Sequence, residues 1–208
     1  MLTGCVELSL QVLVRRLMFP AEPIDVNASR LQRELRRLLR LYRGNWVSAG
    51  ESLVAGNAAV NQSAANMYLQ VQSYLNRYGV TLSVGAGEVV VSESVAAGTQ
   101  RWQHVVSDAA VAKPTSSYWV SVSGLTRRVD LLSQDMNYQV VADVSKKAAA
   151  ENGVPYVKWV TAADERVCPE CVSAGRGGDG YGNYREHWRI PSCPLHVGCR
   201  CQLMLYLK

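Results

Sequence analysis

The amino-acid sequence predicts an α+β protein, in which a mostly helical N-terminal module over residues 1–153 precedes a small β-containing module over residues 154–208. Stretches before residue 153 carry apolar residues at helical spacing. The composition changes at Pro155, after which two short runs have the residue types of strands. Five of the six cysteines then lie in the range from Cys168 to Cys201. They indicate that the second module is stabilised by a metal site and not by a large hydrophobic core.

The first predicted helix begins near Ser29 and extends to the region of Gly44. Residues 29–32 (Ser-Arg-Leu-Gln) have the form of a capping box, which satisfies free backbone N–H groups at a helix start. Apolar residues then recur at steps of three and four on one face, namely Leu31, Leu35, Leu38 and Tyr42.

This first helix also carries most of the excess positive charge of a chain whose formal net charge is +5. Its basic residues are Arg30, Arg33, Arg36, Arg37, Arg40 and Arg43, and Glu34 is the acidic residue among them. Such a helix is either a solvated surface or a basic strip that contacts nucleic acid or an acidic protein. We take Arg33, Arg36, Arg37 and Arg40 as candidate contacts for double-stranded DNA or for such a partner.

Three further segments complete the helical module. Residues 47–78 predict a second helix that Gly79 ends. Residues 80–95 alternate Val, Ser, Thr and Glu between glycines and predict a short strand or an irregular loop, whereas 95–112 suit a helix and 113–117 a break. The last segment is a long amphipathic helix that ends at Asn152-Gly153, with apolar residues at Leu125, Val129, Leu132, Met136, Val140 and Val144.

The N-terminal segment is not expected to span a membrane. Its apolar stretch, residues 6–18, is interrupted by Glu7, Arg15 and Arg16, and a spanning helix needs about 20 predominantly apolar residues. We therefore expect no membrane contact, and a reducing, cytosolic origin that keeps the thiols free to bind metal.

Two short pairs of ligand residues in the second module predict a zinc site. Cys168 and Cys171 form a C-x-x-C pair, and His196 and Cys199 form an H-x-x-C pair. Structural zinc is held by four thiolate and imidazole ligands in tetrahedral geometry, usually supplied as two such pairs. Cys201 is the alternative to Cys199 as the fourth ligand, with Cys193 as a weaker substitute, and free thiols or a disulfide are the competing interpretation. Strands predicted at 156–161 and 202–207 would place the ligands at the ends of two strands that can pair.

Two other motifs in this region are weaker. A redox C-x-x-C normally opens a helix after a strand of a parallel sheet, whereas here Gly-rich sequence follows. Residues 175–180 satisfy the G-x-G-x-x-G pattern of dinucleotide-binding proteins, but no strand directly precedes them and no helix former follows. We interpret them as a loop between the two ligand pairs.

The C-terminal module resembles the phage Mu F-like minor head proteins, also called the phage head morphogenesis family. The resemblance rests on residues 159–171 (Trp-Val-Thr-Ala-Ala-Asp-Glu-Arg-Val-Cys-Pro-Glu-Cys) and 194–201 (Pro-Leu-His-Val-Gly-Cys-Arg-Cys). The family has a Trp, a Thr, Asp-x-Arg, C-x-x-C, a Gly and a final Pro-x-His-x-x-Cys-Arg-Cys. Val197 stands where the family commonly has proline. Asp164 and Arg166 match the Asp-x-Arg, and we expect them to support the ligand loop by pairing with each other or with its backbone.

This resemblance implies a structural protein of a tailed-virus head. Such a minor capsid protein would be present near the portal vertex, would contact the portal and major capsid proteins, and would serve head assembly or the packaging and delivery of DNA. Its location would be the virion head, and the host cytoplasm during assembly.

Two other classes of function compete with this expectation. One is a zinc-containing nucleic-acid-binding protein that uses the basic helix. The other is an H-N-H-like nuclease, with His187 and His196 near a metal. A nuclease needs a catalytic ion with an open coordination position, and four protein ligands would leave none. We therefore expect no enzymatic activity.

Overall fold

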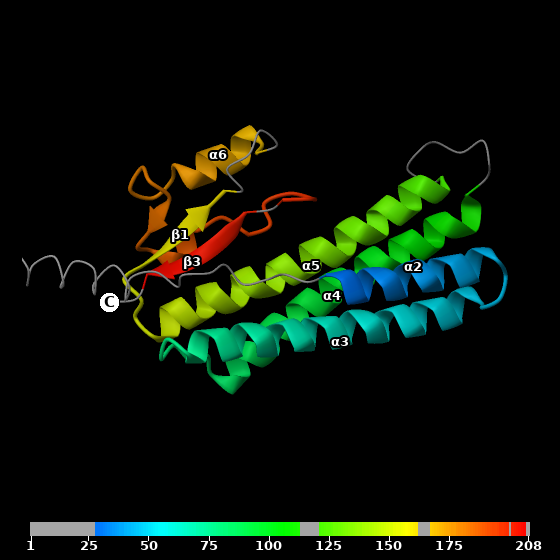
Figure 1. Ribbon diagram of the computed structural model, residues 1–208, viewed down its shortest axis with the longest axis horizontal. Coiled ribbons are helices and arrows are strands. Elements are labelled where there is room, and N and C mark those ends of the chain that lie inside the picture. The colour runs from blue at the N-terminus through cyan, green and yellow to red at the C-terminus, as the bar shows by residue number, and fades with distance from the viewer. Residues whose placement is uncertain (1–27, 113–120, 162–166, 200, 207–208) are drawn as a thin grey trace, which may run out of the picture.

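Four helices run side by side along the long axis of the molecule, within the residues 28–112, 121–161, 167–199 and 201–206 that this computed structural model describes (Figure 1). They are α2 (Ser29–Arg43), α3 (Ala49–Asn76), α4 (Val84–Val111) and α5 (Val122–Glu151). The helices predicted from about 29, over 47–78 and around 125–144 are thereby confirmed. In these ranges, no helix has a stretch long and apolar enough to cross a membrane.

Serine side chains cap the first turns of α3, α4 and α5, but the serine that we predict as the cap of α2 does not have this role. Ala28 is the residue before α2 and provides no side-chain cap, so the capping box expected at residues 29–32 is wrong. The capping box lies at the start of α3, where Ser48 Oγ accepts from the Glu51 N–H at 3.2 Å and the Glu51 carboxylate accepts from the Ser48 N–H at 2.7 Å. Ser121 caps α5 in the simpler way, by accepting from the Gly124 N–H.

The expectation of a strand or loop over residues 80–95 is also wrong, because α4 begins at Val84. Ser83 caps this helix by accepting from the Ala86 N–H. The residues that α4 buries follow at steps of three and four and include Gly87, Val90, Ser94, Gly98 and Trp102. Since glycine and serine occupy core positions, the buried face does not show as an apolar stripe in the sequence.

Small residues let the helices approach one another closely. A Cβ atom at Gly56 of α3 would lie 1.9 Å from Nε1 of Trp102, the fully buried indole of α4. The same indole nitrogen donates to the Ser52 carbonyl at 3.0 Å, which satisfies its hydrogen-bonding requirement inside the core. At Gly98 of α4, a Cβ would lie 2.7 Å from Val60.

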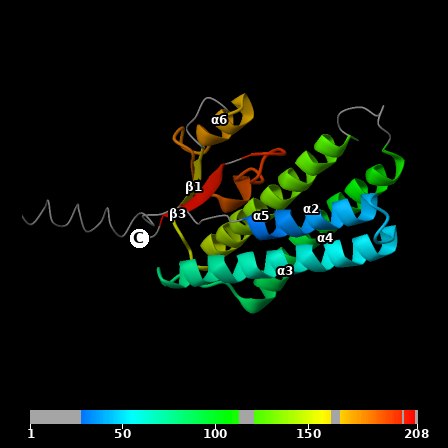
Figure 2. The same ribbon diagram turned by 45° about the vertical axis from the view of Figure 1, so that its right-hand side comes forward.

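The C-terminal part forms a three-stranded antiparallel sheet in the order β2-β1-β3. Its strands are β1 (Tyr156–Val160), β2 (Asn183–Tyr184) and β3 (Gln202–Tyr206), and Val157 pairs with Tyr184 on one side and Leu205 on the other. The two predicted strands are confirmed, and they pair. The sheet lies between α5 and the short helix α6 (Pro169–Gly175) in both ribbon views (Figures 1 and 2).

The helices and the sheet share one continuous hydrophobic core, and α5 connects its two parts. One side of α5 packs on α2, α3 and α4, while β3, β1 and the 3-10 turn η2 (His187–Arg189) pack on the other. The boundary that we predict at residue 154 falls between the end of α5 and β1. An α+β architecture is therefore confirmed, with a sheet that is docked on the bundle.

Candidate metal centre

The first ligand pair lies where the chain enters α6. Cys168 is the residue that caps this helix, and its Sγ accepts from the Cys171 N–H at 3.3 Å. Pro169 occupies the first helical turn, where its missing N–H costs no hydrogen bond. The C-x-x-C therefore does open a short helix, contrary to the expectation from the Gly-rich sequence, but the neighbouring sheet is antiparallel.

The second pair lies in the loop that leads into β3. Gly198 has a φ of 78°, a conformation that favours glycine, and the Cys199 N–H donates to the His196 carbonyl at 3.0 Å. This turn brings the side chains of His196 and Cys199 to the same side as α6. Cys201 directly precedes the first residue of β3 and is buried.

The two pairs come together in space. His196 Nε2 lies 3.0 Å from Cys168 Sγ and 3.2 Å from Cys171 Sγ. Cys171 Sγ lies 3.6 Å from Cys199 Sγ. The ligand atoms form two groups, and within each group all of them lie within 4.8 Å of one another. One group is Cys168, Cys171 and His196, and the other is Cys171, Cys199 and Cys201. These groups share Cys171, and they can hold a metal ion.

The hydrogen bonds of His196 favour metal binding through Nε2. Its Nδ1 lies 3.1 Å from the Val197 carbonyl, which can only accept, so Nδ1 carries the proton. This hydrogen bond is the main reason why the pKa of His196 is raised. The neutral ring then presents the Nε2 lone pair to the thiols, as in many metal-bound histidines whose other nitrogen donates to a carbonyl.

The thiols differ in how readily they lose a proton. The Cys171 N–H lowers the pKa of Cys168 because it stabilises the thiolate at the start of a helix. Burial raises the pKa of Cys171 to about 12. Because a metal ion displaces the proton of a coordinating thiol, Cys171 can join the site as a thiolate only when the metal is bound. Cys193, the weaker substitute, is buried and its thiol donates to the Cys201 carbonyl at 3.2 Å.

Asp135 of α5 supports this loop, although neither motif nor ligand spacing indicates it. Its Oδ1 accepts from the Gly198 N–H at 3.0 Å, and its Oδ2 lies 3.4 Å from Nη1 of Arg101 on α4. Only 2% of the Asp135 side chain is exposed. Burial raises the pKa of this carboxyl, while the Gly198 N–H and Arg101 oppose that rise. A second link runs from Nζ of Lys146 to the Ile190 carbonyl, at 3.1 Å.

Some predicted residues lie outside this centre or outside the residues that the structure describes. Asp164 and Arg166 fall in the undescribed segment 162–166, and the predicted break at 113–117 and the N-terminal stretch at 6–18 are likewise undescribed. His187 lies on η2 and is half-buried. Neither of the two ligand groups found among the described residues includes it.

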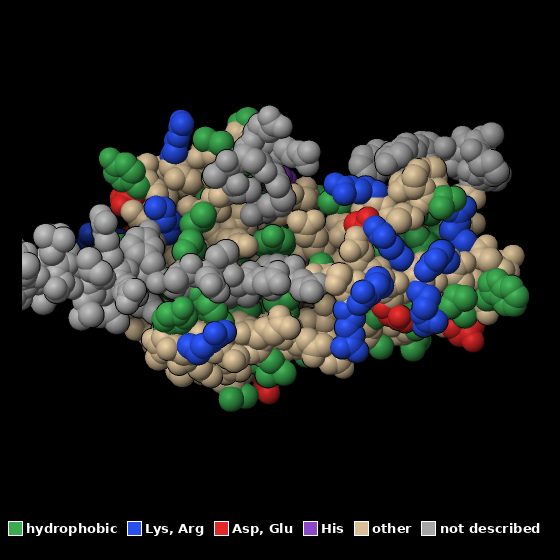
Figure 3. Space-filling model, in the orientation of Figure 1, with side chains coloured by type: hydrophobic (Ala, Val, Ile, Leu, Met, Phe, Trp, Pro, Cys, Tyr) green, Lys and Arg blue, Asp and Glu red, His purple; other side chains and the backbone are tan. Residues whose placement is uncertain are grey.

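The candidate contacts of the basic helix divide into two sets. Arg36 forms a two-bonded ion pair with Asp130 of α5, at 2.6 and 2.5 Å, and Arg37 pairs with Glu34 at 2.8 Å. Arg33 and Arg40 are exposed and line a groove of about 1440 Å³ beside α2. The space-filling view shows the blue side chains gathered over α2 (Figure 3).

Comparison of the chain with protein-family models, with characterised proteins and with solved structures gives no match.

Proposed function

We propose that this chain is a minor capsid or head morphogenesis protein of a tailed virus, a structural component near the portal vertex that aids head assembly or the packaging and delivery of DNA. The observation that carries the proposal is the convergence of Cys168, Cys171, His196 and Cys199, the residues that match the C-x-x-C and His-x-x-Cys of the phage Mu F-like pattern. They come from two segments that the family motif joins. His196 Nε2 lies 3.0 and 3.2 Å from the sulfurs of Cys168 and Cys171, and Cys199 Sγ lies 3.6 Å from Cys171 Sγ.

The proposed ion is Zn²⁺. A set of thiolates and one imidazole suits zinc, which binds sulfur at about 2.3 Å and nitrogen at about 2.0 Å in tetrahedral sites. Tetrahedral angles at those lengths place two sulfurs about 3.8 Å apart. The 3.6 Å between the sulfurs of Cys171 and Cys199 is close to that value, so these two sulfurs can bind the same ion, and the family pattern makes Cys199 the proposed fourth ligand. Cys201 remains the alternative, since its sulfur belongs to the second group.

A zinc ion with four protein ligands acts structurally. It has no open position for water, so its binding contributes to folding and not to catalysis. Here it would join the start of α6 to the loop before β3, and Asp135 extends that link to α5. The docked sheet would then present a fixed surface to its neighbours, for which we propose the portal and major capsid proteins, in the host cytoplasm during assembly and later in the virion.

The test compares two histidine variants in an assembling particle. His196→Ala removes a ligand, so it should abolish incorporation of the protein into heads. His187→Ala changes a residue outside both ligand groups and should leave incorporation at the parent level. Incorporation is measured by quantifying the protein in purified heads, and nuclease activity is measured on the same preparations.

A third variant separates metal binding from imidazole chemistry. His196→Cys supplies a fourth thiolate, as in Cys₄ zinc sites, and should restore incorporation without an imidazole. A nuclease of the H-N-H kind would lose turnover in both His196 variants while its fold persisted. Metal-dependent cleavage by the parent that is lost in a folded His187→Ala or His196→Cys protein would overturn the structural proposal.

A further inference from the structure

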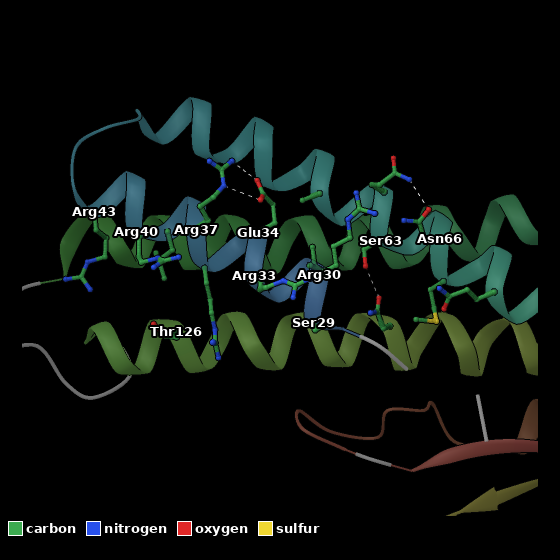
Figure 4. Close-up of a pocket in the computed structure, with 18 of the residues that line it drawn as sticks. Ser29, Arg30, Arg33, Glu34, Arg37, Arg40, Arg43, Ser63, Asn66 and Thr126 are labelled. Atoms are coloured by element: carbon green, nitrogen blue, oxygen red, sulfur yellow. Dashed lines mark hydrogen bonds and ion pairs between the residues drawn. The ribbon is translucent and has the colours of Figure 1, made fainter. Parts of the chain in front are cut away.

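The groove beside α2 carries four arginines without a described partner. Arg30, Arg33, Arg40 and Arg43 all line it and are exposed, and no ion pair of theirs is found in the parts of the chain that the structure describes. Glu34 is the acidic member of the lining, and Arg37 already occupies its carboxylate at 2.8 Å. The groove is therefore an uncompensated positive surface (Figure 4).

The opposite wall offers neutral hydrogen-bonding groups. Gln62, Asn66 and Gln70 of α3 line the groove at four-residue steps, which places them on one face of that helix. Ser63 contributes a hydroxyl beside them, and Asn137 of α5 accepts from it at 3.2 Å. A ligand in the groove would thus meet guanidinium groups from α2 and amide donors from α3.

The arginines follow a regular repeat along one straight helix. Arg30, Arg33, Arg37 and Arg40 are separated by three, four and three residues, so they form a row. At about 1.5 Å per residue, the distance along α2 from Arg30 to Arg40 is about 15 Å. Along a DNA strand, phosphates recur about every 3.4 Å of helix axis, so this row spans about four of them. Guanidinium groups bind phosphates with two parallel hydrogen bonds.

We propose that this groove binds the phosphate backbone of a double-stranded nucleic acid, without reading its sequence. The regular row of guanidiniums matches a regular row of phosphates better than the irregular carboxylates of an acidic protein. No Trp, Tyr or Phe belongs to the lining among the described residues, so the groove has no platform on which the bases of a single strand would stack. The inference goes beyond the proposed function and uses none of the metal ligands, so either can fail without the other.

The first test measures binding of the full chain to a short fluorescent DNA duplex of mixed sequence between about 50 and 200 mM salt. Arg30, Arg33 and Arg40 are changed together to Gln. A matched control changes Arg77, Arg176 and Arg185 to Gln, three exposed arginines outside the groove. Each phosphate contact contributes about −0.9 to the slope of log affinity against log salt. The groove variant should therefore lose about 2.7 of that slope. This corresponds to a loss of about five-hundredfold in affinity at 0.1 M salt relative to 1 M salt, whereas the control should stay near the parent.

The second test looks for a gain of affinity, which a damaged fold cannot produce. Glu34→Gln removes the carboxylate that holds Arg37 and adds one positive charge to the groove. It should bind the duplex more tightly and steepen the salt slope by about 0.9. The proposal is overturned if the parent does not bind duplex at low salt, or if the groove and control variants bind alike. Tighter binding of poly-glutamate or of a single strand than of the duplex would also overturn it.

Discussion

Asp135 in the middle of α5 accepts a hydrogen bond from the backbone N–H of Gly198, 63 positions later in the chain, at 3.0 Å. Gly198 lies between His196 and Cys199, so this bond fixes the loop that supplies the second ligand pair. Arg101 stands on the other side of the carboxylate, at 3.4 Å. A single buried carboxylate thus joins two helices of the bundle to the candidate metal centre.

Replacing Asp135 with Ala should destabilise the protein and weaken its hold on zinc. The change leaves the Gly198 N–H without its acceptor and Arg101 without its partner, which costs about 1–3 kcal/mol in the free energy of unfolding. Loss of such a supporting group should also lower the zinc affinity about tenfold or more. The affinity is measured by competition with a chromophoric chelator. Asp130→Ala, on the same helix but paired with Arg36, is the control and should leave zinc affinity unchanged; equal effects of the two variants would contradict this role.

Zinc removal should unfold the sheet. Substitution of a ligand should abolish zinc binding, whereas substitution of Cys193 should not. We expect one zinc per chain by native mass spectrometry, and a lower melting temperature in chelator, because binding free energy of a site absent from the unfolded chain is folding free energy. Cys168→Ala should lose the metal, whereas Cys193→Ala should retain it. Of Cys199→Ser and Cys201→Ser, the first should lose the metal. An unchanged melting curve in chelator would contradict a structural zinc site.

Asp143 should make the protein less stable as the pH rises. Its pKa is raised from 3.8 to about 6, mainly by burial, against the effects of a hydrogen bond from Gln139 and of nearby Lys146. The folded state therefore binds more protons than the unfolded state between about pH 4 and pH 6, so stability falls as the pH rises through that window. Asp143→Asn removes the charge and should be more stable than the parent at about pH 8, by up to about 3 kcal/mol. The difference should shrink toward about pH 5.

Urea unfolding of both proteins in the same excess of zinc checks this, because the contribution of the metal cancels in the difference. Asp179→Asn provides a control of opposite sign. The pKa of Asp179 is lowered by the hydrogen bonds from Asn183 and the Tyr181 N–H, so its stabilisation is present above the ordinary carboxyl pKa and is lost in acid. A stability difference between Asp143→Asn and the parent that does not change with pH would contradict this prediction. It would show that the pKa of Asp143 is the same in the folded and unfolded protein.

Glycine substitutions should separate close packing from helix propensity. Gly56→Ala places a Cβ against the Trp102 indole, and relieving that overlap should cost about 1–3 kcal/mol in the free energy of unfolding. Gly85, in the first turn of α4, has no neighbouring atom within 4 Å of an added Cβ. Gly85→Ala should therefore stabilise the protein by up to about 1 kcal/mol, because alanine favours a helix. Thermal denaturation of the two variants measures the contrast, and similar shifts would refute the packing argument.

The sequence predicts those elements whose buried faces are made of large apolar residues. The stripe from Leu125 to Val144 locates α5, and the strand-like runs beside the cysteines locate β1 and β3. The first part of α4 is missed because Gly87 and Ser94 occupy core positions there, so the run of valines at 89–91 suggests a strand instead. In that helix, tertiary packing on small residues outweighs the local pattern.

The candidate site is predicted in part for a related reason. Ligand spacing within each pair is local, so the order of residues along the chain is enough to identify Cys168, Cys171, His196 and Cys199. The support from Asp135 depends on how the loop docks onto α5, which spacing cannot reveal. One signal is present in the sequence, because Asp135 stands three residues after Leu132, on the face of the helix that is otherwise apolar. A charge in that position marks either a helix irregularity or a polar contact across the core.

The position of α5 between the bundle and the sheet has a consequence for how the molecule opens. Amide hydrogens exchange with solvent most slowly where breaking a hydrogen bond requires the largest cooperative unit to unfold. Because one core runs from Trp102 through α5 to Trp159, the amides around Met136 and Val140 should exchange only when bundle and sheet open together. The outer face of α6, which no other helix of the described residues covers (Figures 1 and 2), should exchange by smaller and more frequent openings. Protection would then decline from the centre of α5 outward, in both directions along the same molecule.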